Sequence, residues 1–334
     1  MKNIVFRADA KTCIGTGDLV SLIHLSRYFE KEGWRAHFII RGYDLGLALA
    51  EKHALKNLSV IDPDSGIEEE VDNINRYIKK NGIDAAFFEI TERPLADYRG
   101  ITPEAIKACV CFDGAVPDDF DLVVNWDVSA EETFRGRAAG RARFLLGPQY
   151  VILPADFQFD RIRERKDKET VRTVLITLGG ADEFDLTKKA VEALAGLDTS
   201  LELHIILGSG YRYRETLKRR LGDLALKYEL KQNIASMFQE YMNCDLAISA
   251  GGLTAYELVC TRTPALLTAV YEHQVTRCEY FDKKRYARYM GFRTIDPVMV
   301  KEALRRSVAV DPGIFPRTDS IREAVDEIYE RHHA

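Results

Sequence analysis

Short apolar runs alternate with longer amphipathic stretches along almost the whole chain. The apolar runs are rich in β-branched and aromatic residues, which is typical of strands, and they predict strands at 3–7, 35–40, 58–61, 84–90, 108–112, 121–126, 173–178, 202–207, 246–250 and 264–270. The amphipathic stretches repeat their apolar positions at helical spacing and predict helices near 18–32, 43–53, 66–81, 102–107, 185–196, 212–227, 234–242, 254–260 and 274–289.

This alternation breaks once. Residues 155–172 are dense in charge and lack a strand signal, so we interpret them as a linker between an N-terminal domain, 1–154, and a C-terminal domain, 173–334. Strands that alternate with helices form parallel sheets covered by helices. The sequence therefore predicts an α/β fold of two doubly wound, Rossmann-like domains, with a ligand in the crevice at the carboxyl ends of both sheets.

Composition narrows the classes of function. Lys and Arg total 47 against 52 Asp and Glu, a net charge of −5, so the chain lacks the positive field that nucleic-acid binding exploits and no nucleic-acid partner is expected. No stretch approaches the roughly 18 apolar residues that a membrane span needs. The six cysteines fit neither a metal motif nor a disulfide framework. We expect a cytoplasmic protein with no metal and no cofactor.

Three glycine-bearing turns each follow a predicted strand and lead into a helix, at 11–18, 175–182 and 247–258. Glycine lets the backbone approach a ligand, and a helix N-terminus offers unpaired N–H groups to a phosphate. The first turn, Gly15-Thr16-Gly17, lacks the third glycine of the dinucleotide fingerprint, and its Asp18 would repel a phosphate. A diphosphate therefore fits the second half better, and the first turn should face another group.

The segment 245–274 resembles the nucleotide-binding motif of the MurG-like glycosyltransferases. Within that superfamily the chain is most similar to the nucleotide-sugar hydrolases of pseudaminic-acid biosynthesis and to the related spore-coat polysaccharide proteins. Further matching segments, in the order of the family, are 5–18, 120–127, 145–157 and 175–182. The resemblance implies a two-domain GT-B fold whose C-terminal domain holds the nucleotide, with uridine as the expected base and cytidine as the alternative.

The resemblance also implies a set of nucleotide-binding residues. Glu257 stands where the family binds the ribose, and a carboxylate that accepts from two adjacent hydroxyls suits that role. Thr254 would offer its hydroxyl and N–H group to phosphate, and Gln274 with His273 would reach the diphosphate or the sugar. The residues expected to line the diphosphate and base are Gly179, Gly180, Ser249, Ala250, Gly251 and Gly252.

The chain departs from the hydrolase pattern in its first half. Where the family has Gly-x-Gly-His and an Arg three residues later, this chain has Asp18 and Ser21. The family's Asp-x-Tyr after the fourth strand becomes 89–91, and its Leu-Arg-x-Glu-Phe becomes 153–157. These changes affect the side expected to hold the sugar and the attacking group, whose candidate substrate-binding residues are Arg7, Asp9, Thr16, Gly17, Ser21 and Glu89.

Asp18 is the candidate catalytic residue. Cleavage at an anomeric carbon passes through an oxocarbenium-like state, and a base that takes the nucleophile's proton accelerates the reaction. A carboxylate is a weaker base than the histidine it replaces, but it stays ionised at neutral pH and suits a good leaving group such as a nucleoside diphosphate. The alternative is that Asp18 only caps the first helix. For Asp9, a structural role is the alternative.

These residues leave several functions open. In a nucleotide-sugar hydrolase, water attacks the anomeric carbon; in an inverting glycosyltransferase, an acceptor hydroxyl does so from the space around Asp18, Ser21 and Glu89. A homologue that has lost catalysis would bind the nucleotide without turnover. A nucleotide-sugar epimerase is the least supported reading, because the additional ionisable residues it needs are not evident. The sequence gives no indication of the oligomeric state.

Overall fold

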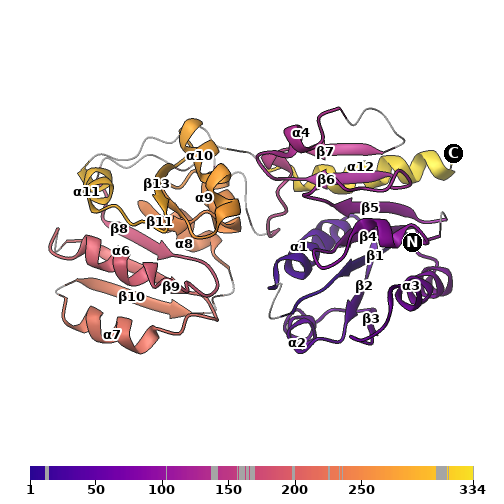
Figure 1. Cartoon of the computed structure of the whole chain (residues 1–334), viewed down its shortest axis with the longest axis horizontal. Coiled ribbons are helices and arrows are strands. Elements are labelled where there is room, and N and C mark those ends of the chain that lie inside the picture. The colour runs from indigo at the N-terminus through magenta and orange to yellow at the C-terminus, as the bar shows by residue number, and fades with distance from the viewer. Residues whose placement is uncertain are drawn as a thin grey trace. The chain divides into compact units, whose positions relative to one another are not determined.

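The computed structural model describes the chain apart from residues 12–14, 103, 137–141, 156, 158–161, 163–164, 166–169, 198–199, 225, 233, 235, 306–313, 315 and 334. The chain divides into two compact units (Figure 1). The first unit joins Met1–Ala155 to Pro316–Ala334, and the second unit is Asp156–Phe315. Both units are built on a parallel sheet with helices packed against it, so the predicted fold class of two Rossmann-like α/β domains is confirmed.

The first unit contains a parallel sheet in the order β3-β2-β1-β4-β5-β6-β7. Its strands are β1 (Asn3–Ala8), β2 (Arg35–Arg41), β3 (Leu58–Ile61), β4 (Ala85–Glu89), β5 (Ile106–Val110), β6 (Leu122–Asn125) and β7 (Arg143–Leu146). Successive side chains of a strand point to opposite faces. Phe6 and Phe87 accordingly join one hydrophobic core, and Val5 and Phe88 join another. The sheet is therefore buried on both sides.

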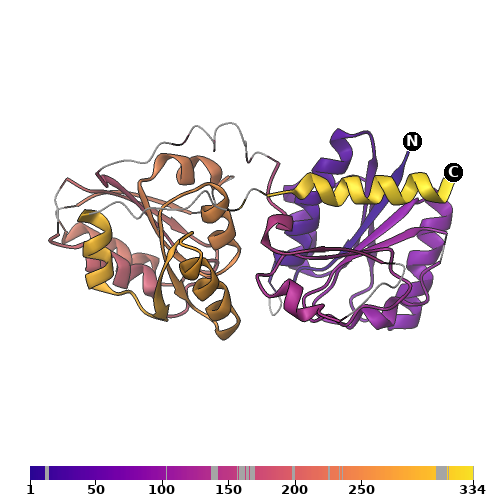
Figure 2. The ribbon, with the colours of Figure 1, turned by 90° about the horizontal axis from the view of Figure 1, so that it is seen from above.

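Helices supply the rest of these two cores. Helices α1 (Gly17–Lys31), α2 (Asp44–Lys52) and α12 (Thr318–His333) contribute to the core around Phe6, and α1 contacts α12. Helix α3 (Ile67–Asn81) contributes Ile74 and Ile78 to the core around Phe88. Figure 2 shows α12 in yellow lying along this unit, far in sequence from the strands it covers. A short helix, α4 (Ala130–Thr133), follows β6.

The second unit repeats the plan with the strand order β10-β9-β8-β11-β12-β13, again parallel. Its strands are β8 (Thr173–Thr177), β9 (Glu202–Leu207), β10 (Lys227–Gln232), β11 (Leu246–Ala250), β12 (Ala265–Ala269) and β13 (Arg288–Phe292). Its helices are α6 (Leu186–Leu194), α7 (Arg214–Gly222), α8 (Phe238–Asn243), α9 (Leu253–Cys260), α10 (Val275–Lys283) and α11 (Pro297–Arg305). The central strands β8 and β11 are pairing partners, so the turns that follow them lie at the same edge of the sheet.

The strands that the sequence did not predict are all edge strands. β7 ends the first sheet, and β10 and β13 end the second. An edge strand is buried incompletely and needs few apolar residues, and β10 reads Lys-Tyr-Glu-Leu-Lys-Gln with its first half exposed. The predicted helices 212–227 and 274–289 were therefore too long, because α7 ends at Gly222 and α10 ends at Lys283.

The predicted helix 102–107 was wrong, because β5 begins at Ile106. Lys107 interrupts the apolar run in the sequence, but its ammonium forms an ion pair with Asp119 and its side chain is buried. The predicted strand 108–112 was consequently placed two residues too late. Cys111 and Phe112 therefore lie in the loop after β5 rather than within the strand.

The C-terminal helix corrects the predicted domain limits. Residues 173–334 were expected to form one domain, but α12 belongs to the first unit. Its Ile321 and Val325 join the core that contains Phe29, and its Asp326 accepts a hydrogen bond from Trp34 at 3.1 Å. An amphipathic helix can cover either of two apolar sheets, so its pattern alone does not show which one it covers.

Much of the predicted linker, 155–172, lies outside the described residues. Among its described residues, Phe157 packs against Phe238 with ring centroids 5.2 Å apart. Arg165 donates hydrogen bonds of 2.6 Å to the carbonyls of Tyr241 and Cys244. These contacts attach that part of the segment to the second unit.

Candidate functional site

A buried ionic network fills the carboxyl ends of β1 and β2 in the first unit. The guanidinium of Arg7 lies 2.7 Å from carboxylate oxygens of both Asp9 and Glu70. Arg41 also pairs with Glu70 through its side chain and donates its backbone N–H to Asp9 at 2.7 Å. The Tyr98 hydroxyl donates to Glu70 at 2.8 Å. The network ties strand β1 to strand β2 and to helix α3, which carries Glu70.

Arg7 and Asp9 are engaged in this buried network. They are 1% and 4% exposed. Burial alone would lower the pKa of Arg7, but the adjacent carboxylates of Asp9 and Glu70 raise it above its usual value. Burial would raise the pKa of Glu70, and the two arginines hold it below its usual value instead. The structure thus places both predicted substrate-binding residues in internal ion pairs, which favours the structural role for Asp9.

Asp18 lies in the first turn of α1 and bonds across to the loop after β4. Its carboxylate accepts hydrogen bonds from the Thr91 hydroxyl at 2.6 Å and from the Thr91 N–H at 3.1 Å. The N-cap position of α1 belongs to Thr16, and no described side chain caps the helix there; Gly17 is its first residue. The alternative that Asp18 serves only as the N-cap is therefore not supported by its position.

The pKa of the Asp18 carboxyl depends on its burial and on its neighbours. Partial burial raises the pKa of its carboxyl, the two hydrogen bonds from Thr91 lower it, and the negative charge of Asp9 raises it; the net shift is upward. A raised pKa brings a carboxylate closer to the range in which it takes up a proton during catalysis.

Glu89 lies next to both Asp18 and Ser21, which act on its carboxyl. Glu89 ends β4 and is 4% exposed, and Ser21 on α1 is 6% exposed. Burial raises the pKa of Glu89 well above its usual value, the charge of Asp18 raises it further, and the Ser21 hydroxyl lowers it. Within the described part of the chain, neither Glu89 Oε2 nor Ser21 Oγ has a hydrogen-bond partner of good geometry. The carboxyls of Glu89 and Asp18 therefore lie close together, and the pKa of each is raised above its usual value.

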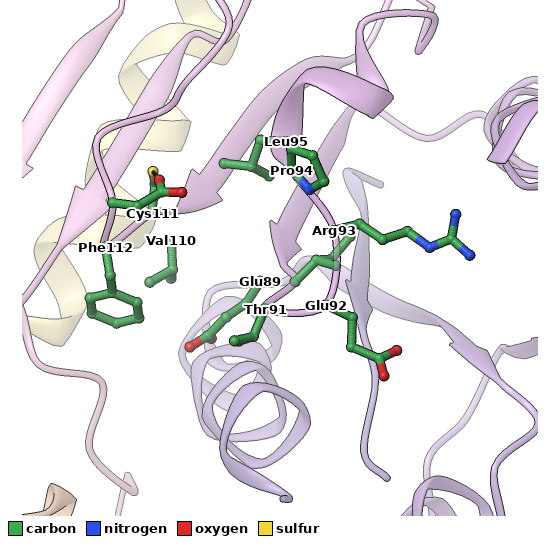
Figure 3. A pocket seen from close by; sticks show the side chains of 11 residues that line it. Glu89, Thr91, Glu92, Arg93, Pro94, Leu95, Val110, Cys111 and Phe112 are labelled. Atoms are coloured by element: carbon green, nitrogen blue, oxygen red, sulfur yellow. Dashed lines mark hydrogen bonds between the residues drawn. The ribbon is translucent and has the colours of Figure 1, made fainter. Parts of the chain in front are cut away.

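A pocket of about 370 Å³ opens beside Glu89 (Figure 3). It is lined by the loop after β4, residues 89–95, and by residues 110–113 at the end of β5. Figure 3 shows Glu89 and Thr91 on one side and Val110 and Phe112 on the other. Apart from Glu89, the sequence did not predict its lining. The lining could have been predicted from topology, because adjacent parallel strands bring the loops that follow them together. The strand predicted at 108–112 placed Phe112 inside a strand, however, and hid this loop.

The first glycine turn of the second unit, after β8, is closed by a carboxylate. Gly179 has a φ of +87°, and the carbonyl of Gly180 accepts a hydrogen bond from the Gly210 N–H at 2.9 Å. Helix α6 follows, and Asp182 accepts hydrogen bonds from the N–H groups of Leu186 at 2.9 Å and Thr187 at 2.8 Å. The N-terminus of α6 is therefore already occupied by a negative charge.

The second glycine turn, after β11, leads into α9 without such a cap. Gly252 holds the N-cap position, and no side-chain cap is formed there by any residue that the structure describes. A Cβ at Gly251 would lie 2.4 Å from the sulfur of Cys278, so this close packing requires glycine. Gln274 accepts a hydrogen bond from the Val270 N–H at 2.9 Å, and its amide nitrogen lies toward Gly252. The α9 N-terminus thus keeps the properties of an anion seat.

The other predicted nucleotide-binding residues lie around this turn. Ala250 ends β11, and the Ser249 hydroxyl donates to the Thr177 carbonyl at 2.9 Å, which commits it to the sheet. Thr254 is the second residue of α9. His273 is exposed and stacks on Tyr271 with ring centroids 5.8 Å apart.

Glu257 on α9 is oriented by a buried phenol. The Tyr241 hydroxyl donates to its carboxylate at 2.5 Å. Burial raises the pKa of Tyr241 well above its usual value, and the charge of Glu257 raises it further, so the phenol remains a donor. The carboxylate expected to bind ribose therefore has a fixed position.

Arg277 is a residue of this site that the sequence did not indicate. It is 9% exposed and donates hydrogen bonds of 3.0 Å to the carbonyl of Gly251 and to the hydroxyl of Tyr256. Its contact with the glycine turn depends on the packing of α10 against the sheet, so no spacing in the sequence could reveal it.

The described residues contain no group of three or more His, Cys, Asp or Glu side chains placed to hold a metal ion. Among their helices, none combines the length and the apolar character that crossing a membrane requires.

Comparisons with known proteins show what this chain is similar to. Residues 173–331 match the glycosyltransferase family 28 C-terminal domain. The chain is 27% identical over 229 residues, 67% of each protein, to the spore coat polysaccharide biosynthesis protein SpsG of Bacillus subtilis. It is 29% identical over 153 residues to a Helicobacter pylori protein named pseudaminic acid cytidylyltransferase and UDP-2,4-diacetamido-2,4,6-trideoxy-beta-L-altropyranose hydrolase; this match covers 46% of the chain and 27% of that protein.

A solved structure shows the same fold. The chain matches MurG of Acinetobacter baumannii with a TM-score of 0.68 and 16% identity, over 99% of this chain and 100% of that one. The matched C-terminal domain, the relatives and the shared fold together support a MurG-like GT-B family for this chain, with similarity to the spore-coat polysaccharide and pseudaminic-acid pathway proteins.

Proposed function

We propose that this protein binds a nucleotide-activated sugar, most simply a UDP-sugar, and hydrolyses it at the anomeric carbon during the biosynthesis of a surface polysaccharide or of an acidic sugar. The observation that carries the proposal is the N-terminus of α9 behind the Gly251-Gly252 turn, which no described side chain caps, with Glu257 one turn further along. The name of the Helicobacter relative, which includes a UDP-sugar hydrolase, supports the choice of uridine and of hydrolysis.

The second unit supplies the groups that a nucleoside diphosphate needs. The first N–H groups of α9 carry a partial positive charge that suits a phosphate, and Thr254 adds a hydroxyl beside them. Glu257, held by Tyr241, accepts from the two ribose hydroxyls. Gln274, fixed through its oxygen by Val270, directs its amide donor toward the same turn. Arg277 positions the turn by binding the Gly251 carbonyl.

The first unit supplies the acid–base groups. In the proposed step, a water oxygen bonds to the anomeric carbon while the bond from that carbon to the diphosphate oxygen breaks. Asp18 takes the proton from the water, and the diphosphate leaves with the bonding electron pair, stabilised by the N–H groups of α9. Thr91 holds the Asp18 carboxylate through two hydrogen bonds. The step assigns no role to a metal ion.

A transferase is the second candidate, and the pocket beside Glu89 favours it. Its volume of about 370 Å³ is more than one attacking water requires, and Ser21 is small where related hydrolases have arginine. An acceptor hydroxyl in that pocket would replace water in the same step, with the same transfer of a proton to Asp18.

The test is to incubate the protein with a panel of UDP- and CDP-sugars, with and without sugar acceptors, and to follow nucleotide release by chromatography. We expect release of UDP without an acceptor. Release only when an acceptor is present would establish the transferase instead. Binding of UDP without any turnover would identify a homologue that has lost catalysis, and failure to bind either diphosphate in a calorimeter would refute the nucleotide proposal.

A further inference from the structure

The pocket beside Glu89 contains a buried polar atom for which the described residues provide no hydrogen-bond partner of good geometry. The Glu89 side chain lines the pocket and is 4% exposed. Its Oε2 atom has no hydrogen-bond partner among the described residues. A buried polar atom left in this way costs free energy unless water or a ligand satisfies it. The wall of the pocket therefore includes a buried carboxyl whose hydrogen-bonding capacity the described residues do not fully use.

The charges around this group are mostly negative. Asp18 acts on Glu89 from α1, and Asp113 lines the pocket after β5. Glu92, which also lines it, is paired with Lys11 at 2.8 Å. The positively charged lining residue, Arg93, extends away from Glu89 and Phe112 in Figure 3. A carboxylate placed beside Glu89 would therefore meet like charges, whereas an uncharged polar group would not.

Apolar side chains also line the pocket. Phe112 is 42% exposed, and its ring is held edge-to-face against Trp126 at a centroid distance of 4.7 Å. Val110, at the end of β5, and Leu95, on the loop after β4, add further apolar surface. An apolar wall that faces a few well-placed polar groups is the usual form of a site for a small organic ligand. A sugar ring has both kinds of surface, because its C–H groups can lie on an aromatic ring while its hydroxyls point to a hydrogen-bonding group.

We propose that this pocket is the sugar subsite of the first unit, and that it selects an uncharged, polyhydroxylated ring over a ring that carries a carboxylate. The inference rests on the proposed function. The proposal requires Glu89 to be protonated in the folded protein, so that its carboxyl donates a hydrogen bond to a hydroxyl or amide oxygen of the sugar. Asp18 supplies the fixed negative charge that repels an anionic ring, so it contributes to specificity as well as acting as the base.

The experiment compares two ligands that differ at one carbon. These are the methylene-linked, non-hydrolysable analogues of UDP-glucose and UDP-glucuronic acid, with UDP alone as the reference, titrated in a calorimeter at neutral pH. We expect the wild-type protein to bind the glucose analogue at least tenfold more tightly than the glucuronate analogue. Asp18→Asn keeps the shape of the side chain and removes its charge, and it should reduce this ratio at least threefold without changing the affinity for UDP.

Matched variants separate charge from hydrogen bonding. Asp97→Asn removes an exposed carboxylate of the same unit that does not line the pocket, and it should leave the ratio unchanged. Glu89→Gln keeps an N–H donor and should keep the binding of the glucose analogue, whereas Glu89→Leu should weaken it at least fivefold.

Each outcome is informative. Equal affinities for the two analogues, or a ratio that Asp18→Asn does not change, would overturn the inference while normal UDP binding upheld the nucleotide proposal. Undiminished binding of the glucose analogue by Glu89→Leu would also overturn it. Failure of the wild-type protein to bind UDP would refute the proposed function itself, and the inference with it.

Discussion

Two helices of this protein begin in the same way and carry opposite chemistry. Helix α1 follows β1 and α9 follows β11, each after a turn that contains glycine. Neither N-cap residue, Thr16 or Gly252, forms a side-chain cap with any described group. The second residue of α1 is Asp18, and the second residue of α9 is Thr254. The second position therefore carries a carboxylate in α1 and a hydroxyl in α9.

This difference teaches that a glycine turn before a helix does not by itself identify a phosphate site. The partial positive charge at a helix N-terminus favours a phosphate only when no carboxylate is already there. Helix α6 provides the third case, because Asp182 occupies its first N–H groups although Gly179 and Gly180 precede it. A carboxylate in the first turn of α1 and one that precedes α6 distinguish these two helix starts from the proposed phosphate site at α9.

The largest expected effect is on the base at α1. Asp18→Asn keeps the side chain's size and a carbonyl oxygen for Thr91, but it cannot take up a proton. Loss of a general base typically lowers the rate by about 10²- to 10⁴-fold, and we expect a fall in kcat of that size in assays of UDP release. Calorimetry should show an unchanged affinity for UDP. A variant with wild-type turnover would remove Asp18 from the chemistry.

The next largest effect is expected from a substitution that gives α9 the carboxylate that α1 has. Thr254→Asp places a carboxylate at the second position of α9, where it would repel a diphosphate at close range. A like-charge interaction near the protein surface amounts to a few kcal/mol, so the affinity for UDP should fall by roughly 100-fold. Thr254→Asn is the matched uncharged variant and should lose far less. Equal affinities of the two variants would show that the phosphates bind elsewhere.

The sequence predicted the two sheets well because their central strands are buried on both faces. The cores of β1, β4, β8 and β11 are continuous apolar runs, and such runs leave few alternatives. The edge strands β7, β10 and β13 are only partly buried. β10 was missed because it is largely polar, and β7 and β13 are short runs that each begin with an arginine. The position of α12 could not be predicted either, because tertiary packing determines which of the two sheets this helix covers.

The site was predicted in part, for a related reason. Asp18, Ser21 and Glu89 come from segments that each follow or begin next to a central strand, so their meeting followed from topology. The closed turn at α6 depends on the backbone of Asp182, whose φ of +42° brings its carboxylate back to the helix start. Arg277 and Phe112 take part through tertiary contacts that no local pattern records.

A smaller effect tests the closed turn at α6. Asp182→Ala removes the carboxylate that accepts from Leu186 and Thr187, and loss of a helix cap typically costs about 1 kcal/mol. We expect a loss of that order in the free energy of unfolding, measured with urea, and a UDP affinity within twofold of the wild-type value. Asp182→Asn, which can still cap, serves as the control. A tenfold change in UDP affinity would indicate that the diphosphate binds at the start of α6 and not at the start of α9.

The smallest effect concerns Glu89 and appears only as a dependence on pH. The pKa of Glu89 in the folded protein is raised above its value of about 4.3 in an unfolded chain. Between these two pKa values the folded state binds one proton more than the unfolded state. The free energy of unfolding therefore falls as pH rises through that interval. Glu89→Gln cannot ionise and escapes this loss.

The melting temperatures of Glu89→Gln and the wild-type protein should therefore approach each other near pH 4, with the variant becoming relatively more stable as pH rises. Most other titrating groups are common to both proteins and cancel in the difference. Asp18 does not cancel fully, because it loses a neighbouring acid in the variant, but this change acts in the same direction. A difference that stays constant across pH would mean that Glu89 ionises as readily in the folded protein as in the unfolded chain. It would then add a second negative charge beside Asp18, and the neutral donor required for the sugar would be absent.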